Sequence, residues 1–145
     1  MISLLIPPLL RAKDFYFCNI QVENPFPLER GFINFYLTSV VEQILLETGW
    51  IQNCKKGKPV KVTVTNLTFQ GSSISGNRFS GYQLNISLNL QVEDFNKSYT
   101  YSKFVALPDP SLGTLTIRRA LPDLFETYSL KIKVDLLNYM KQKEK

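Results

Sequence analysis

The stretch that decides the fold is "YQLNISLNLQV", residues 82–92, because its side chains alternate strictly between apolar and polar. A period of two places successive side chains on opposite faces of a β-strand. One face is therefore apolar and needs a cover, whereas the other carries only uncharged polar groups. The apolar set is Tyr82, Leu84, Ile86, Leu88, Leu90 and Val92, and the polar set is Gln83, Asn85, Ser87, Asn89 and Gln91.

Further strands are predicted on both sides of this one. "SYTYSKFVAL" at 98–107 follows a tight turn, "EDFNK", which favours an antiparallel pair. Upstream, "VKVTVTNLTFQ" at 60–70 alternates, and its phase slips at Asn66, which predicts a β-bulge. Residues 15–23 are rich in aromatic and β-branched side chains, which predicts a first strand.

Two segments have helical periodicity instead. Apolar side chains at 30–48 recur at spacings of three and four, and Gly49 gives a stop. A similar stripe from Ile117 to Tyr139 predicts a helix that runs to the C-terminus, in which Pro122 should cause a kink or mark the start of the main part. The predicted order is therefore strand, helix, three strands, helix.

This order predicts an α+β fold with two layers. Antiparallel strands with one apolar face need a cover, and two amphipathic helices supply it. We expect a four-stranded, mostly antiparallel sheet covered on one face by two helices, in the order β-α-β-β-β-α. The 145 residues form a single predicted domain, with an extended N-terminal segment at 1–13 and a basic tail at 141–145.

The composition argues against an enzyme. The chain has no histidine, which excludes histidine-based triads and histidine zinc ligands. It also lacks a glycine-rich phosphate loop followed by Lys-Ser or Lys-Thr. We expect no catalytic residue, no metal and no cofactor. The net charge of +5 instead favours an anionic partner, for which phosphate-bearing lipid, nucleic acid and an acidic protein remain open.

The two cysteines form no scaffold or metal motif. Strict alternation would place Cys18 on one face with Tyr16, Ile20 and Val22, which predicts a buried free thiol. A bridge to Cys54 would require an oxidising compartment. The N-terminal "MISLLIPPLL" is too short to span a bilayer and has no basic residue before its apolar run. We therefore expect either a cytoplasmic protein or a mature fragment whose leader was removed.

Two kinds of residue are candidates for binding. The uncharged polar face of 82–92 is either an ordinary solvent face or a surface that meets another wet, polar surface, such as the lining of a large β-barrel. Among the basic residues, the best placed to hold phosphates are Arg78, in a loop rich in glycine and serine, and the Arg118–Arg119 pair at the start of the second helix. Lys103 is a further candidate for an anionic ligand.

Two stretches resemble the LPS-assembly lipoprotein family, LptE, of the Gram-negative outer membrane. "FCNIQVENPFPLERGFINFYLTSVVEQILLETGW" at 17–50 resembles the family's first strand, its Asn-ended corner and the following helix. "FSGYQLNISLNLQVED" at 79–94 resembles its central strand with the pattern x-x-Tyr-x-Leu. The resemblance extends over residues 14–140 and departs from the family at the front, where no lipobox cysteine occurs.

The resemblance implies a non-enzymatic domain that plugs an LptD-type outer-membrane barrel, assists its assembly and binds lipopolysaccharide. It implies a location at the periplasmic side of the outer membrane. Lipopolysaccharide contacts would then fall on Arg78, Lys103, Arg118 and Arg119, and the uncharged face would meet the barrel lumen. The alternatives are a basic nucleic-acid-binding module, although the uncharged face argues against nucleic acid, and a generic periplasmic interaction domain.

Overall fold

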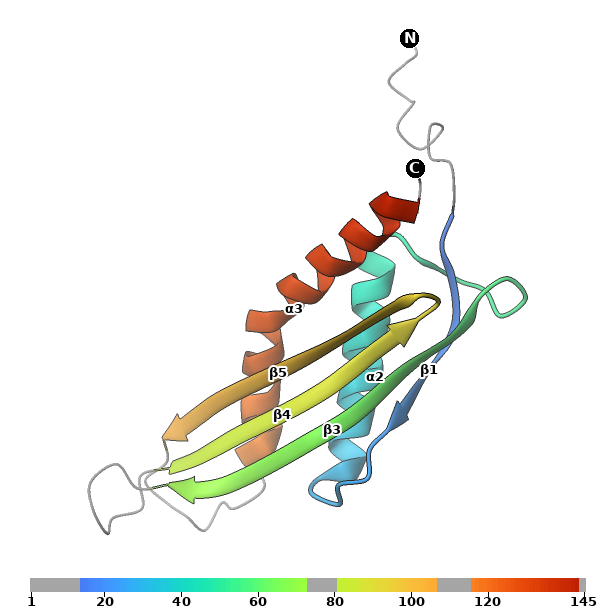
Figure 1. Ribbon diagram of the computed structural model, residues 1–145. Helices are drawn as coiled ribbons and strands as arrows, with labels where there is room; N and C mark the ends of the chain where they lie inside the picture. Colours follow the sequence, from blue (N-terminus) through green and yellow to red (C-terminus); the bar gives the residue numbers. More distant parts are fainter. Residues whose placement is uncertain (1–13, 73–80, 107–115, 144–145) are drawn as a thin grey trace.

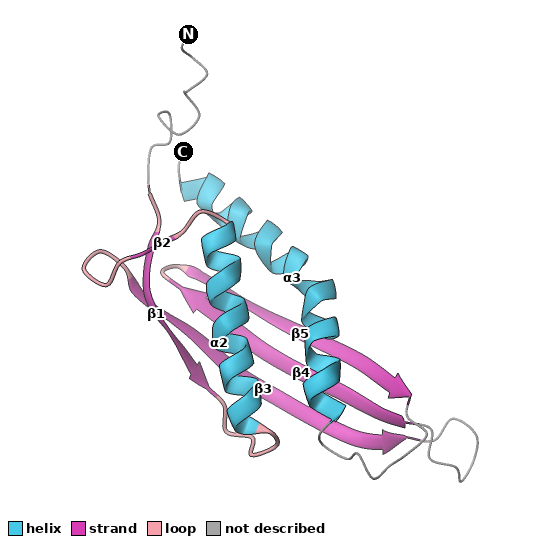
Figure 2. Cartoon of the chain, turned by 180° about the vertical axis from the view of Figure 1, so that it is seen from behind, coloured by secondary structure: helices cyan, strands magenta, loops and turns pink. Residues whose placement is uncertain are grey.

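The protein is a two-layer α+β sandwich, as the computed structural model shows for residues 14–72, 81–106 and 116–143 (Figure 1). One layer is a twisted sheet, and both helices lie on the same face of it, which is clearest from behind (Figure 2). The predicted fold class is confirmed. The strands are β1 Tyr16–Glu23, β2 Ile51–Gln52, β3 Lys58–Ser72, β4 Gly81–Val92 and β5 Phe95–Ala106, and the helices are α2 Arg30–Glu47 and α3 Thr116–Lys143.

Over the described residues the sheet has five strands rather than the four predicted, in the order β2-β1-β3-β4-β5. β3, β4 and β5 form an antiparallel meander, whereas β1 runs parallel to both of its neighbours. The strand missing from the prediction is β2, which has only two residues, both exposed. Two residues are too few to show any periodicity, and β2 exists because its backbone pairs with Tyr16 and Phe17 of β1.

Irregular register occurs at two points in the sheet. The β3–β4 pairing shifts between Val64 and Asn66, so the predicted bulge is confirmed. A second shift, between Phe17 and Ile20 in the β1–β3 pairing, was not predicted. Because of it, Phe17 is buried ahead of the shift, and Ile20 packs against the core beyond it. The prediction that side chains alternate strictly from Cys18 to Ile20 is therefore wrong. Cys18 is only half-buried.

Local hydrogen bonds fix the corner between β1 and α2. The Asn24 side chain accepts a hydrogen bond from the Phe26 N–H and donates one to Asn34 Oδ1, each at 3.0 Å. The Arg30 side chain donates to the Phe26 and Pro25 carbonyls at 3.0 and 2.9 Å. The two prolines thus lie in a corner that side-chain hydrogen bonds hold in shape.

The core lies between the sheet and the two helices. Five side chains of β4, from Leu84 to Val92 at every second position, are at most 1% exposed. Trp50 and Phe15 close one end with their rings 5.2 Å apart. The helix α3 is a single element that contains Pro122 in its second turn, so Pro122 does not mark its start. At β5, Lys97 and Lys103 occupy positions on the helix side, and Tyr99 and Tyr101 lie between them in the same row.

Candidate functional site

The candidate site is the open face of the sheet, opposite the helices (Figure 1). Its centre is the outward row of β4, which is flanked by outward residues of β3 and β5. From Thr63 to Gln70 on β3, and along the outward positions of β4 and β5, no side chain is charged. We call this surface the polar face. It comprises Thr63, Asn66, Thr68 and Gln70, then Gln83, Asn85, Ser87, Asn89 and Gln91, then Asn96, Ser98, Thr100, Ser102 and Phe104.

Side-chain hydrogen bonds run across the strands of the polar face. Asn85 donates to Thr68 Oγ1 at 3.1 Å and accepts from Ser102 Oγ at 2.6 Å, so it links three strands. Ser87 and Thr100 share a hydrogen bond of 3.0 Å. These contacts link neighbouring strands on the polar face, since cross-strand pairs are the unit that stabilises a sheet surface.

Asn89 extends the same pattern toward the β4–β5 turn. Its Nδ2 donates to Asn96 Oδ1 at 2.7 Å and to Ser98 Oγ at 3.1 Å. Every one of these groups keeps further donor or acceptor capacity. The polar face is therefore an ordered array of hydrogen-bonding groups without net charge.

Charge appears only at the border of the polar face. Lys61 Nζ lies 3.3 Å from Glu23 Oε1, and both side chains are largely exposed. A shallow depression of about 400 Å³ lies next to them, lined by Gln21, Lys58, Pro59, Lys61, Gln91 and Glu93. An exposed ion pair of this kind is worth little in stability. The Lys61–Glu23 ion pair lies where the uncharged surface ends.

The structure brings together the five predicted polar residues of 82–92, but it places neither Lys103 nor Arg118 with them. Lys103 lies on the helix side of β5, opposite Leu84 of β4. Arg118 lies at the start of α3. Its Nε is 2.8 Å from Glu29 Oε1, and its Cζ is 5.8 Å from the centre of the Phe32 ring. Arg78 and the Arg119 side chain lie outside the described residues. Lipopolysaccharide binding by these four stays a prediction.

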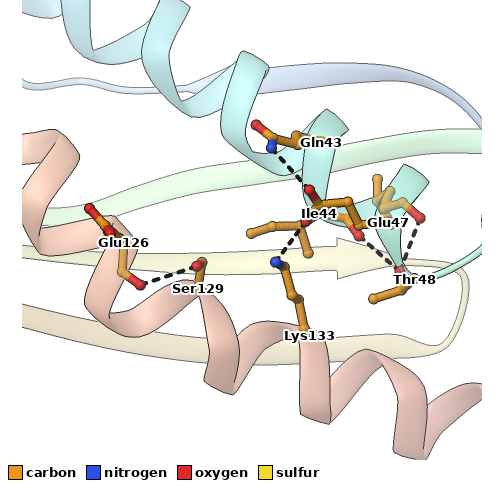
Figure 3. A network of polar contacts seen from close by, with 8 residues as sticks. Gln43, Ile44, Glu47, Thr48, Glu126, Ser129 and Lys133 are labelled. Atoms are coloured by element: carbon orange, nitrogen blue, oxygen red, sulfur yellow. Dashed lines mark hydrogen bonds and ion pairs between the residues drawn. The ribbon is translucent and has the colours of Figure 1, made fainter.

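A second polar cluster lies in a groove of about 330 Å³ between the helices (Figure 3). Lys133 Nζ contacts Glu47 Oε1 at 2.6 Å, and Gln43 donates to the other oxygen of Glu47 at 3.0 Å. The hydrogen bonds from Lys133 and Gln43 lower the pKa of the Glu47 carboxyl. This carboxylate is therefore ionised and satisfied, which suits a contact between helices and not an acid or base catalyst.

Buried or half-buried tyrosines connect the sheet to α3. Tyr99 donates to Asp135 Oδ2 at 2.7 Å, and Tyr139 donates to Glu93 Oε1 at 3.0 Å. Burial is the main cause that raises the pKa of Tyr99, and the hydrogen bond to Asp135 raises it further. Burial, followed by the hydrogen bond to Glu93, raises the pKa of Tyr139 to about 12. These phenols stay protonated at neutral pH, and their partners hold α3 on the sheet.

These tyrosines predict a loss of stability at alkaline pH. An unfolded tyrosine ionises near pH 10, whereas folded Tyr139 holds its proton to about pH 12. Their contribution is complete below pH 10 and is lost as the pH rises through 12. We expect the midpoint of thermal unfolding to fall in that interval.

Thermal melts followed by circular dichroism between pH 8 and 12 measure this decline. The Tyr139→Phe protein, which has no hydroxyl at that position, should decline less steeply between pH 10 and 12. Identical slopes for the two proteins would show that Tyr139 does not carry the effect.

Cys18 and Cys54 form a disulfide, so the prediction of a free, buried thiol at Cys18 is wrong. Cys18 lies at the register shift of β1, and Cys54 lies in the loop between β2 and β3. Backbone hydrogen bonds hold the same loop: Asn53 N–H donates to the Phe17 carbonyl at 2.8 Å, and Gly57 N–H to the Asn53 carbonyl at 2.7 Å. The irregular strand, not the alternation, brings the two sulfurs together.

The described residues form no metal site and no membrane-spanning helix. Across 14–72, 81–106 and 116–143, no group of three or more cysteine, aspartate or glutamate side chains is arranged to hold a metal ion. Within the same ranges, neither helix combines the length and the apolar character that crossing a membrane would require.

Comparison with known proteins finds similarity to other sequences and to solved structures. No model of a known protein family matches the chain. An uncharacterized protein of Aquifex aeolicus (strain VF5) is 29% identical over 139 residues, which are 94% of this chain and 90% of that protein. A minor lipoprotein from Acinetobacter baumannii is similar with 12% identity and a TM-score of 0.46, over 83% of this chain and 93% of its own. The rare lipoprotein B from Shewanella oneidensis is similar with 11% identity and a TM-score of 0.36, over 87% of this chain and 96% of its own.

Proposed function

We propose that this protein is a non-enzymatic, LptE-like subunit of an outer-membrane lipopolysaccharide translocon. In this role the polar face lies against the lumen of an LptD-type β-barrel and assists the assembly of that barrel. The subunit would act on the periplasmic side of the outer membrane and bind lipopolysaccharide. The sequence resemblance over residues 14–140 supports this role, and the polar face supplies a physical reason for it.

The observation that carries the proposal is the absence of charge from the polar face described above. Burying a charged side chain costs several kcal/mol unless it gains a partner, about 3–5 kcal/mol for an uncompensated charge. Amide and hydroxyl groups can instead exchange hydrogen bonds with water and with another polar surface. The interior of a large membrane β-barrel is such a surface, polar and wet. An exposed face with Lys and Glu at every second position would not fit there.

The disulfide provides independent support. Disulfides persist in oxidising compartments, and the bacterial periplasm is one of them. The bridge between Cys18 and Cys54 therefore fits a protein that works outside the cytoplasm. A location at the periplasmic side of the outer membrane agrees with this chemistry.

Nucleic-acid binding, the alternative raised by the net charge, receives less support from the same surface. Sheets that bind single strands use several aromatic side chains among basic ones. The outward positions of β3, β4 and β5 carry one aromatic residue, Phe104, and Lys61 at the border is paired with Glu23. The polar face thus offers neither a stacking platform nor a basic groove.

Co-expression with an LptD-type barrel, followed by affinity capture of the barrel, tests the proposal. We expect the wild-type chain to be captured. Ser87→Glu places a carboxylate at the centre of the polar face, and the capture should fall by at least about tenfold, since an unpaired charge is then desolvated. Ser39→Glu makes the same change at an exposed position of α2, away from the polar face, and should leave the capture unchanged.

The variants must fold for the comparison to count, and circular dichroism verifies this. Equal capture of the Ser87→Glu and Ser39→Glu proteins would show that the polar face is not the contact surface. Failure of the wild-type chain both to enter the complex and to bind lipopolysaccharide would overturn the proposed function as a whole.

A further inference from the structure

The outer side of α3 carries a line of exposed apolar side chains in its C-terminal half. Leu130, Val134 and Leu137 are 66%, 46% and 49% exposed. Their spacing of four and then three residues places them on one face of the helix. Single exposed apolar residues are normal, but a row on one helix face is a candidate contact surface. We call these three residues the apolar stripe.

The opposite face of the C-terminal half of α3 packs against the core of the protein. Ile132, Leu136 and Met140 are at most 5% exposed and belong to the core beneath α3. The apolar stripe is therefore not the core side of a displaced helix. It is a second apolar face, turned away from the sheet.

The charges next to the apolar stripe are of one sign. Residues 128–143 contain four lysines and a single carboxylate, Asp135, which accepts the hydrogen bond from Tyr99 of β5. Lys133 and Lys143 form ion pairs with Glu47 and Asp94. Lys131 and Lys141 are exposed, and no ion pair joins them to any residue that the structure describes. The stripe thus combines apolar side chains with two available ammonium groups.

We propose that the apolar stripe, with Lys131 and Lys141, docks the protein on an anionic lipid surface. Apolar side chains of an interfacial helix enter the boundary between headgroups and acyl chains, and lysines beside them attract anionic headgroups. Lys131 and Lys141 have long aliphatic stems that let the ammonium groups reach the headgroups from the sides of the helix.

Charge complementarity selects this occupant over a second copy of the chain. Two apolar stripes facing each other would bring the lysines of both copies together at a desolvated contact, where like charges repel. An anionic bilayer neutralises the same lysines. The inference does not rest on the proposed function, because the helices and the polar face lie on opposite sides of the sheet (Figure 2).

Vesicle co-sedimentation of the purified full chain tests this inference. The probes are vesicles of phosphatidylcholine with phosphatidylglycerol, and vesicles of phosphatidylcholine alone. We expect binding to the anionic vesicles that weakens as salt is added. The Leu130→Ser, Leu137→Ser double variant should lose at least about tenfold in affinity because apolar area no longer enters the interface.

Two further variants separate the contributions. Lys131→Gln with Lys141→Gln should reduce affinity for the anionic vesicles by about tenfold, since each lysine near an anionic surface adds favourable energy. Phe35→Ser removes an apolar side chain that is 74% exposed on α2, outside the stripe, and should leave binding unchanged.

Wild-type protein that binds anionic vesicles no better than neutral ones would overturn the inference. So would equal binding of the Leu130→Ser, Leu137→Ser protein and the Phe35→Ser protein. If light scattering shows that the stripe variant turns a dimer into a monomer without a change in vesicle binding, the stripe contacts a second copy and the inference is wrong.

Discussion

Replacement of both Cys18 and Cys54 by serine is expected to lower the free energy of unfolding by about 3–4 kcal/mol. The disulfide closes a loop between residues 36 apart in sequence. The stabilisation comes mainly from the restriction that this loop places on the unfolded chain. Cys54 is exposed and Cys18 half-buried, so serine leaves no large cavity and adds little packing cost. Urea unfolding of the oxidised wild type and of the double variant measures the difference.

A reductant supplies the control for this comparison. Reduced wild-type protein should unfold at nearly the same urea concentration as the double variant, and the reductant should not affect the variant. A double variant as stable as the oxidised wild type would show that the bridge does not constrain the unfolded chain.

Gly57→Ala is expected to lower the free energy of unfolding by about 3 kcal/mol through a backbone clash. A Cβ at Gly57 would lie 2.6 Å from the N, Cα and C atoms of Phe17. These are main-chain atoms of β1, so they cannot rotate aside as a flexible side chain does. The strand or the loop must move, at a point where Asn53 also bonds to the Phe17 carbonyl. Thermal or urea unfolding measures the loss.

Gly31→Ala is the matched control for Gly57→Ala. A Cβ at Gly31, in the first turn of α2, meets no atom within 4 Å apart from its chain neighbours and the nearby backbone of its own helix. There alanine should raise stability by about 0.5–1 kcal/mol, because glycine has the larger conformational entropy in the unfolded chain. A Gly57→Ala protein at least as stable as the wild type would contradict the close approach of the two chain segments.

The two largest effects should not be additive. The disulfide and Gly57 both act where the loop between β2 and β3 contacts β1. Once Gly57→Ala has displaced that loop, the disulfide is expected to add less to the free energy of unfolding. Variants that share a contact in this way show coupling of about 0.5–3 kcal/mol. Combining all three substitutions therefore should cost less than the sum of the separate losses.

Most of the fold follows from side-chain periodicity. The strict alternation of 82–92 predicts β4, and five of its six apolar side chains are buried as predicted. The helical spacing from residue 30 onward predicts α2, which ends at Glu47 ahead of Gly49. The phase slip at Asn66 even predicts the bulge of β3. In each case many side chains share one face, so the periodic pattern is long enough to predict the element.

The errors occur where pairing, not patterning, determines the structure. The two residues of β2 form a strand because the Ile51 N–H donates a hydrogen bond to the Phe15 carbonyl. No pattern in the sequence near Ile51 predicts that contact. The register shift of β1 places Phe17 and Ile20 on the same side, and from the sequence alone the run looks regular. The same shift explains why strict alternation fails to place Cys18. Such shifts depend on the neighbouring strand, which a single segment does not reveal.

The candidate site was predictable in part. The uncharged row of β4 is visible in the sequence, but the matching rows of β3 and β5 become one surface only through the register. The contact of Arg118 with Glu29 was not predictable, since the two residues are 89 positions apart. The Asp135 partner of Tyr99 had one usable signal, because Tyr99 lies on the apolar side of a strand and a buried phenol usually needs an acceptor. That rule fails for Tyr101, whose buried hydroxyl has no hydrogen-bond partner among the described residues.

The position of Lys97 and Lys103 has a consequence for the free protein. β5 is the long edge of the sheet, and its outer backbone groups could pair with a strand of another copy. A strand added there would bring its own apolar row against the two ammonium groups on the helix side of β5 and strip their water. Growth into edge-to-edge fibres is thus opposed at both ends of β5. The edge of the sheet therefore carries its own protection against pairing between copies.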